Sequence, residues 1–347
     1  MGIRPVRCAT LPQAGWERCV QRDRTCRRGL VPETLQSTPP RRASDTVSAD
    51  PASTRPIDTR SKARAPTPGR RHDVADDWAP LELARPPFDQ LAGYAGLLGD
   101  DDFPTLDALS DALAATPGCE GLRCVEQNQF LFRDGLHFEQ RIHDHGAIAT
   151  RPRRWHDLFS VLMWLRYPRL KRALNRLQVE DLPLQGRGNR TRRQQSLTHI
   201  DEAGLLVASE DPALLERLDA HDWPGLFLDR RADWHRRIVV HVFGHALFEL
   251  ARDPHLTMAG KVLWFHVPEG FCTWPFDARA ALLDRAAADA VSSGVLGWDP
   301  AGMVSLPLSG IPGWREGNGD PAFVATAECF RGRDPQRRYA APLGIAG

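Results

Sequence analysis

Histidine and carboxylate side chains hold divalent metal ions and act as general acids and bases, and three separate segments of this chain place such groups beside strongly apolar stretches. One segment carries a His-Asp dipeptide, which is the core of one metal-dependent phosphohydrolase signature. The candidate catalytic residues are therefore His156, Asp157 and His245. The candidate metal ligands are Asp201, Glu202 and Glu249.

The segment around His245 has the most regular spacing. His241, His245 and Glu249 recur every four residues, which places them on one side of a helix and makes them possible metal ligands. Val242 follows His241, so the general-base Glu of the zinc-protease motif is absent. The alternative is a His–Glu pair that joins a buried helix to its neighbours, because an unpaired buried polar group costs about 1–3 kcal/mol. We favour this alternative for the helix.

The other two pairs also have structural explanations. His156-Asp157 fits helix capping with a buried hydrogen bond. Asp201-Glu202 fits a solvated turn, which gains functional interest only if the turn folds onto His156 or His245. Nothing supports a covalent nucleophile, because the chain has no Gly-x-Ser-x-Gly motif, and no Gly-rich phosphate loop or dinucleotide-binding motif follows an expected strand.

The elements that must position these residues follow from periodicity and end signals. Residues 154–167 predict a helix, which Pro168 breaks or restarts to give a second helix over 169–179. A basic loop is expected over 185–195. Strands at 196–200 and 205–208 predict a hairpin, with residues 201–204 as its turn and Gly204 at a position of positive φ. A long helix is expected from about 233 to 252, since its apolar residues cluster on nearly all sides.

The remaining segments complete the predicted fold. Helices are expected at 86–98 and at 103–115, with Asp102 as a possible N-cap of the second. Residues 122–132 and 136–142 are predicted to be extended, joined by a turn at 133–135. Asp211-Pro212 should begin a helix that runs to about 220. A strand at 261–267 and a helix at 277–295 follow. Helices and hairpins without a regular βαβ alternation predict an α+β, mostly helical single domain with short β-hairpins.

The near-zero net charge of +1 hides two regions of opposite sign. Residues 1–72 carry 15 Lys and Arg against 6 Asp and Glu, and residues 73–347 carry 30 against 38. The first region holds 9 of the 28 prolines and a single aromatic residue, Trp16. A segment so poor in large apolar groups cannot offset the entropy of ordering its chain. We therefore predict a disordered basic extension over 1–75, a folded domain over 76–335 and a flexible tail over 336–347.

Several classes of protein and partner are disfavoured. No stretch approaches the roughly 20 apolar residues that span a bilayer, and the first 16 residues lack the apolar region of a signal peptide. We expect a cytoplasmic protein. Nucleic acid is disfavoured as a partner, except for weak binding through the basic extension, whose arginines are dispersed and lack interleaved aromatics. Arg141 and Arg151 are candidates to bind a small anionic ligand.

Several motifs together resemble the bacterial domain of unknown function 3025, DUF3025, over roughly residues 80–330. They are Phe138-Glu139-Gln140-Arg141-Ile142, Trp155-His156-Asp157-Leu158-Phe159, Ala173-Leu174-Asn175, Asp201-Glu202, Gly244-His245-Ala246-Leu247 and Gly310-Ile311-Pro312-Gly313-Trp314. The resemblance implies a bacterial protein of a family without an established activity. It also favours the Trp-His-Asp, Asp-Glu and Gly-His-Ala-Leu motifs as the site, and it adds Asn175 as a candidate binding residue.

Two functions remain open at this point. The first is a hydrolase-like enzyme, in one version metal-dependent, that uses the candidate residues as ligands and as general acids and bases. The second is a non-catalytic module that binds a small anion or a protein partner, in which the same residues form a buried structural network. The sequence identifies no cofactor and no substrate. Convergence of His156, His245 and Asp201 or Glu202 in one pocket would favour the enzyme.

Overall fold

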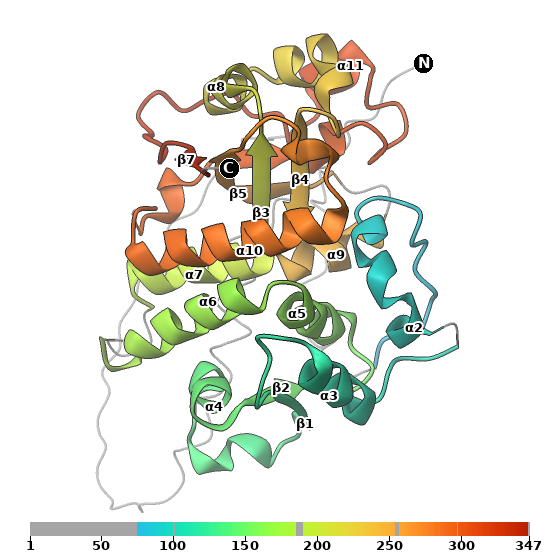
Figure 1. The fold of residues 1–347 in the computed structure, drawn as a ribbon, viewed down its shortest axis with the longest axis vertical. Helices are drawn as coiled ribbons and strands as arrows, with labels where there is room; N and C mark the ends of the chain where they lie inside the picture. The colour runs from blue at the N-terminus through green and yellow to red at the C-terminus, as the bar shows by residue number, and fades with distance from the viewer. Residues whose placement is uncertain (1–74, 100, 185–189, 254–256, 297, 346–347) are drawn as a thin grey trace, which may run out of the picture.

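A mixed β-sheet stands beside a group of packed helices in the computed structural model of the chain (Figure 1). The structure describes residues 75–345, apart from 100, 185–189, 254–256 and 297. The expected N-terminal extension therefore lies outside the described residues, except for its last position. Within the described residues, α-helices and strands coexist in the α+β arrangement that the sequence predicts.

The larger sheet has strand order β4-β3-β5-β6, and β7 also pairs with β5. Its strands are β3 (Gly204–Ser209), β4 (Ile238–Val242), β5 (Ala259–His266), β6 (Ser305–Pro307) and β7 (Leu343–Gly344). The central strand β3 pairs antiparallel with β4 and parallel with β5, and all its residues are buried. β7 lies within the segment expected to be a flexible tail, where it continues the edge of the sheet. A second, two-stranded parallel sheet joins β1 (Arg123–Glu126) and β2 (Ala147–Thr150).

Helices cover the sheet and fill the space between the two sheets (Figure 1). The helix α10 (Phe276–Ser293) packs along α6 (Pro168–Glu180), which in turn contacts α7 (Arg192–Ala203). The helix α5 (Trp155–Arg166) packs against the short α9 (His245–Ala251). The remaining α-helices are α2 (Ala95–Leu98), α3 (Leu106–Ala115), α4 (Phe138–His145), α8 (Pro212–Ala220) and α11 (Pro321–Thr326). One cluster of buried apolar side chains extends from the larger sheet into the packed helices.

Helices with strong end signals form as the sequence predicts. Pro168 is the first residue of α6, so it restarts the chain as a helix directly after α5. Asp211 caps α8, where its side chain accepts a hydrogen bond from the Ala213 amide and Pro212 occupies the first turn. The helix over 103–115 is shorter than expected, because Thr105 caps it in place of Asp102. Among the described residues, no helix has the length and apolar character needed to cross a bilayer.

The long helix expected over 233–252 is wrong. Residues Ile238–Val242 form strand β4, because a run of β-branched residues packs well between β3 and the helices. The helix α9 begins only at His245, after Gly244. His241 lies on the strand, where its ring stacks on Phe276 with centroids 4.5 Å apart and its Nδ1 is 3.1 Å from the Tyr167 hydroxyl. The four-residue spacing of His241 and His245 therefore does not place them on one face.

The hairpin expected over 196–208 is also wrong. Thr191 and Gln194 form a reciprocal capping box that begins α7, so residues 192–203 are helical and lead straight into β3. Gly204 has a φ of −73° rather than a positive value. Of the two extended stretches expected over 122–132 and 136–142, the first contains strand β1, and the second lies largely in α4. A 3₁₀ turn separates them, and β1 pairs in parallel with β2 instead of forming a hairpin. The basic loop expected over 185–195 lies partly outside the described residues.

Candidate functional site

Three of the candidate residues converge where three helix ends meet. His156 is the second residue of α5, Glu202 lies in the last turn of α7, and His245 is the first residue of α9. The two imidazole Nε2 atoms are 3.1 Å apart. Glu202 Oε2 lies 3.4 Å from Nε2 of His245 and 3.9 Å from Nε2 of His156. These three side chains form what we call the His–His–Glu cluster, and residues from distant parts of the chain supply it.

Strand pairing brings Glu202 to His245. The Gly204 carbonyl, at the start of β3, accepts hydrogen bonds from the amides of Phe243 and Gly244 at the end of β4. Gly244 permits this close approach, because a Cβ there would stand 2.5 Å from Ala203 N and Cα and 2.5 Å from the Glu202 carbonyl oxygen. The last turn of α7 and the first turn of α9 therefore lie in direct contact.

Aromatic packing fixes the start of α5. Trp155 is fully buried, and its ring stacks on Trp78 with centroids 4.8 Å apart and on Phe159 with centroids 5.5 Å apart. Because Trp155 occupies the core, the next residue, His156, turns toward α9, and its ring meets the His245 ring edge-on at 4.5 Å. The side chain of His156 is 31% exposed, whereas that of His245 is 4% exposed. The cluster is thus reached from solvent on the side of His156.

Acceptors engage the outer nitrogen of each ring. His156 Nδ1 donates to Glu249 Oε2 at 2.9 Å, and His245 Nδ1 donates to the Asp201 carbonyl oxygen at 2.8 Å. A carbonyl oxygen can only accept, so Nδ1 of His245 carries the proton and its Nε2 presents a lone pair. Both histidines therefore point Nε2 at Glu202.

The charges of the cluster are unequal. Burial disfavours the charged form of His156, but its hydrogen bond to Glu249 and the nearby Glu202 raise the pKa to about 9. Burial, reinforced by the positive charge of His156, lowers the pKa of His245 well below its ordinary value. Burial raises the pKa of Glu202 to about 7, against the attraction of His156. In the absence of an ion, the cluster thus pairs a cationic with a neutral imidazole beside a carboxyl that titrates near neutrality.

A buried lysine supports the cluster from behind. Lys171 is 5% exposed, and its Nζ donates to Asp201 Oδ1 at 2.6 Å. Burial is the largest influence on Asp201 and opposes its charge, but Lys171 and the two histidines together lower the pKa of this carboxyl. Asp201 is therefore engaged by Lys171 through its side chain and by His245 through its backbone. The sequence motifs give Lys171 no role, although a lysine beside the apolar positions Leu170 and Leu174 of a helix is a signal for a paired buried charge.

The other candidates make their contacts outside the cluster. Asp157 pairs with Arg151 at 2.6 Å and also accepts the Arg151 amide at 2.6 Å. Arg141 donates to Asp134 at 2.7 Å. Asn175 donates to the Glu139 carboxylate at 2.6 Å. The candidate anion-binding residues are thus engaged with protein groups, and Glu249 supports His156 from the edge of the cluster.

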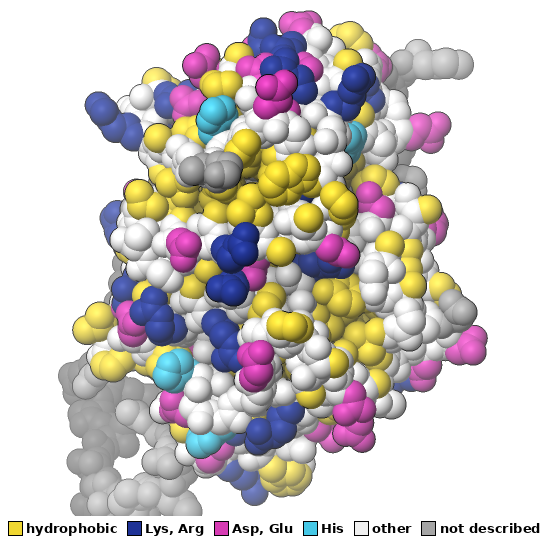
Figure 2. Space-filling model, in the orientation of Figure 1, with side chains coloured by type: hydrophobic (Ala, Val, Ile, Leu, Met, Phe, Trp, Pro, Cys, Tyr) yellow, Lys and Arg dark blue, Asp and Glu magenta, His cyan; other side chains and the backbone are white. Residues whose placement is uncertain are grey.

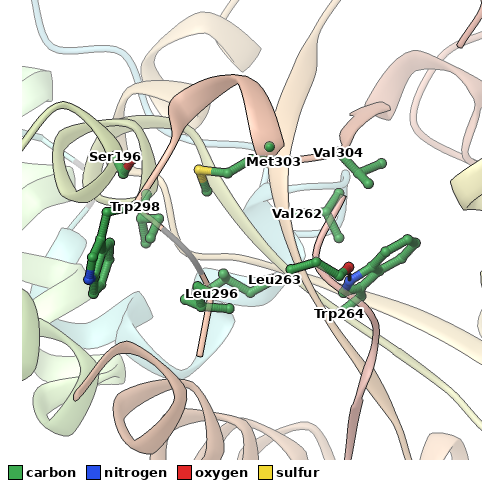
Figure 3. Close-up of a pocket in the computed structure, with 11 residues that line it drawn as sticks. Ser196, Val262, Leu263, Trp264, Leu296, Trp298, Met303 and Val304 are labelled. Carbon is green, nitrogen blue, oxygen red and sulfur yellow. Dashed lines mark hydrogen bonds between the residues drawn. The ribbon is translucent and has the colours of Figure 1, made fainter. Parts of the chain in front are cut away.

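An apolar pocket in the sheet region is separate from this site. It lies between α7, β5 and the segment after α10, and its labelled walls include Trp264, Trp298 and Met303 (Figure 3). None of the residues in the cluster lines it. The arrangement with chemical potential is therefore the polar, partly exposed cluster.

Comparison with known proteins gives one match. The family model described as a protein of unknown function, DUF3025, matches residues 122–334, and this range contains the whole His–His–Glu cluster. No curated protein matches the chain, and no solved structure matches it.

Proposed function

The chain belongs to the DUF3025 family, and we propose that it is a divalent-metal-dependent, hydrolase-like enzyme whose ion is held by His156, Glu202 and His245. The observation that carries the proposal is the convergence of two imidazole Nε2 atoms and one carboxylate oxygen from three segments of the chain. Two histidines and one carboxylate are a ligand set for catalytic zinc and for non-haem iron.

The donor spacing fits an ion. Ligand atoms about 2.0–2.1 Å from a tetrahedral centre lie about 3.3 Å from one another. The corresponding separations here are 3.1 Å between the histidines, and 3.4 and 3.9 Å from Glu202 to His245 and His156. An ion would also replace the proton that the two Nε2 atoms now share, and it would offset the burial of the Glu202 charge.

The surroundings fit as well. Metal-bound histidines commonly donate their other ring N–H to a carboxylate or a backbone carbonyl, which fixes the tautomer and the ring orientation. Here Glu249 receives this hydrogen bond from His156, and the Asp201 carbonyl receives it from His245. Three protein ligands leave a coordination position open for water or substrate, as in catalytic rather than structural sites.

The proposed reaction class is hydrolysis, in which water is added across an ester, amide or phosphoester bond. A bound divalent ion would polarise the substrate oxygen and lower the pKa of water to near neutrality. Glu249 and the Asp201 carbonyl orient the two histidine ligands. The exposed side of His156 and Glu202 stays open to substrate. Lys171, together with the histidines, favours the ionised form of Asp201 behind the site.

One observation favours a second candidate, a non-catalytic anion- or protein-binding module. The hydrogen bonds from His156 to Glu249 and to His245 already form a network that would join α5 and α9 without an ion. In that case the cluster stabilises the fold, and its loss lowers stability by a few kcal/mol.

Metal binding distinguishes the two candidates. Protein stripped with EDTA is titrated with Zn²⁺, Mn²⁺ and Fe²⁺ by calorimetry, and melting is followed in parallel. We expect one ion to bind and raise the melting temperature, whereas Glu202→Gln and His245→Ala should lose most of the affinity. His143→Ala, an exposed histidine on α4, is the matched control and should bind normally. Unchanged melting and no bound ion in the parent protein would reject the metal site.

Activity is tested with the same proteins. A panel of phosphoesters, carboxylic esters and peptides is screened with each ion that binds. Turnover should require the ion, and Glu202→Gln should abolish it while keeping the fold, as measured by circular dichroism. Metal binding without turnover of any substrate class would leave the site as a structural ion site and contradict the enzymatic proposal.

A further inference from the structure

An arginine-lined groove lies at the opposite end of α5 from the cluster. Four arginines line it, Arg166, Arg169, Arg172 and Arg285, together with three acidic residues, Glu120, Asp277 and Asp284. Its volume is about 1010 Å³, at the upper end of the range for small-molecule sites. Lys and Arg side chains gather across the middle of the face shown in Figure 2, over α6 and α10.

The protein positions Arg166 at the groove. Its guanidinium lies between the rings of Tyr94 and Phe276, 4.7 and 5.0 Å from their centroids, and its side chain is 10% exposed. Gly93 leaves room for it, since a Cβ there would stand 3.3 Å from Arg166 Nη2. Arg166 pairs with Asp277, a side chain 82% exposed, while its buried Nε has no hydrogen-bond partner among the described residues. Because this Nε is buried and Nη2 donates to the Gln90 carbonyl oxygen at 3.3 Å, Arg166 contributes positive charge to the wall of the groove rather than a free donor.

The other three arginines form no ion pair among the described residues. Arg172 donates to two neutral carbonyl oxygens, those of Gly118 at 2.6 Å and Glu120 at 2.8 Å. The side chains of Arg169 and Arg285 are exposed and make no hydrogen bond or ion pair with the residues that the structure describes. Both stand near Asp284 and act on its charge through space.

Asp284 is already committed to the protein. Its carboxylate accepts the amides of Arg169 and Leu170 at 3.1 and 2.8 Å, so it caps the start of α6. It is 4% exposed and forms no direct ion pair with the arginines that face the groove. Among the described residues, the guanidinium groups without a hydrogen-bond partner in the groove are therefore those of Arg169 and Arg285.

We propose that this groove binds a small anion carrying two or more phosphate groups. Guanidinium groups match phosphate oxygens in geometry and stay charged at every physiological pH. Three carboxylates also line the groove, but Asp277 pairs with Arg166, Asp284 accepts two amides of α6 and Glu120 accepts the Gly118 amide. Among the described residues, no carboxylate pairs directly with Arg169 or Arg285. The groove is distinct from the metal site, because Arg166 follows His156 by ten helical residues, about 15 Å along α5. The proposal does not depend on the proposed enzymatic activity.

Calorimetry with pyrophosphate and tripolyphosphate tests the proposal, in EDTA and without added metal, so that the cluster cannot recruit the probe through an ion. We expect 1:1 binding by the full chain. The double variant R169A/R285A should bind at least tenfold more weakly, since each substitution removes a charge-assisted contact. The matched control R176A removes an arginine from the same helix outside the groove, and should stay within twofold of the parent.

The controls separate the possible outcomes. E202Q should bind the probe as the parent does, which keeps this site distinct from the cluster. Equal losses in R176A and R169A/R285A would show general attraction to surface charge and overturn the proposal. Unchanged affinity in R169A/R285A would overturn it as well. Affinity for single-stranded RNA that exceeds that for tripolyphosphate and grows with RNA length would replace the small ligand with a nucleic acid.

Discussion

Replacing Glu249 with Gln is the sharpest test of how the cluster is held. The change keeps the size of the side chain but removes the charge that accepts from His156 Nδ1 at 2.9 Å. Loss of such a supporting carboxylate lowers metal affinity about 10- to 100-fold, which corresponds to about 1.4–2.7 kcal/mol. The free energy of unfolding should change by less than about 1 kcal/mol, because Glu249 is 43% exposed and exposed pairs contribute little.

The assay is zinc affinity measured by competition with a chromophoric chelator, with urea denaturation of the metal-free protein in parallel. Glu216→Gln, an exposed acid on α8, is the matched control and should leave zinc affinity unchanged. Unchanged zinc affinity in Glu249→Gln would refute the reasoning, because His156 would then not need its carboxylate partner to bind the ion. A large loss of stability with no zinc binding in the parent would instead identify the pair as structural.

Three further results are expected. Burial raises the pKa of Asp284 from 3.8 to about 6. The protein should therefore lose about 3 kcal/mol of stability as pH rises through that window, about 1.4 kcal/mol of it between pH 5 and 8. In urea denaturation, Asp284→Asn should not show this loss, whereas Asp289→Asn, on the same helix, should behave as the parent. Gly244→Ala should destabilise the fold by about 1–3 kcal/mol through backbone overlap, whereas Gly96→Ala, with open space around it, should not. EDTA should lower the melting temperature of protein purified with its ion, and added ion should restore it; no response to EDTA would contradict the metal site.

Local chemistry in the sequence was enough for some elements. Pro168 and the Asp211-Pro212 pair set helix starts by fixing φ and by capping free amides, and neither effect needs a distant partner. The α+β class and the family resemblance also follow from the sequence and are confirmed. The capping box at Thr191 is equally local, so the sequence contains the signal that starts α7 in place of the expected hairpin.

The segment around His241 shows where local reasoning fails. An apolar run of Ile and Val is compatible with a buried helix and with a buried strand. Burial on all sides removes the hydrophobic periodicity that distinguishes a helix from a strand. The pairing of β4 with β3 makes this segment a strand, and it places His241 in the core beside Tyr167. The predicted relation between His241 and His245 depended on a helix that tertiary pairing excludes.

By itself, the sequence determined which residue types could do chemistry, His156, Glu202 and His245 among them. It could not determine that these three meet while Asp157 turns to Arg151, because each belongs to a different helix and no local rule relates their ends. The tertiary structure decided it through the hydrogen bonds of the Gly204 carbonyl to the end of β4 and through the missing Cβ of Gly244. These contacts hold the ends of α7 and α9 together, and the burial of Trp155 then directs His156 onto them.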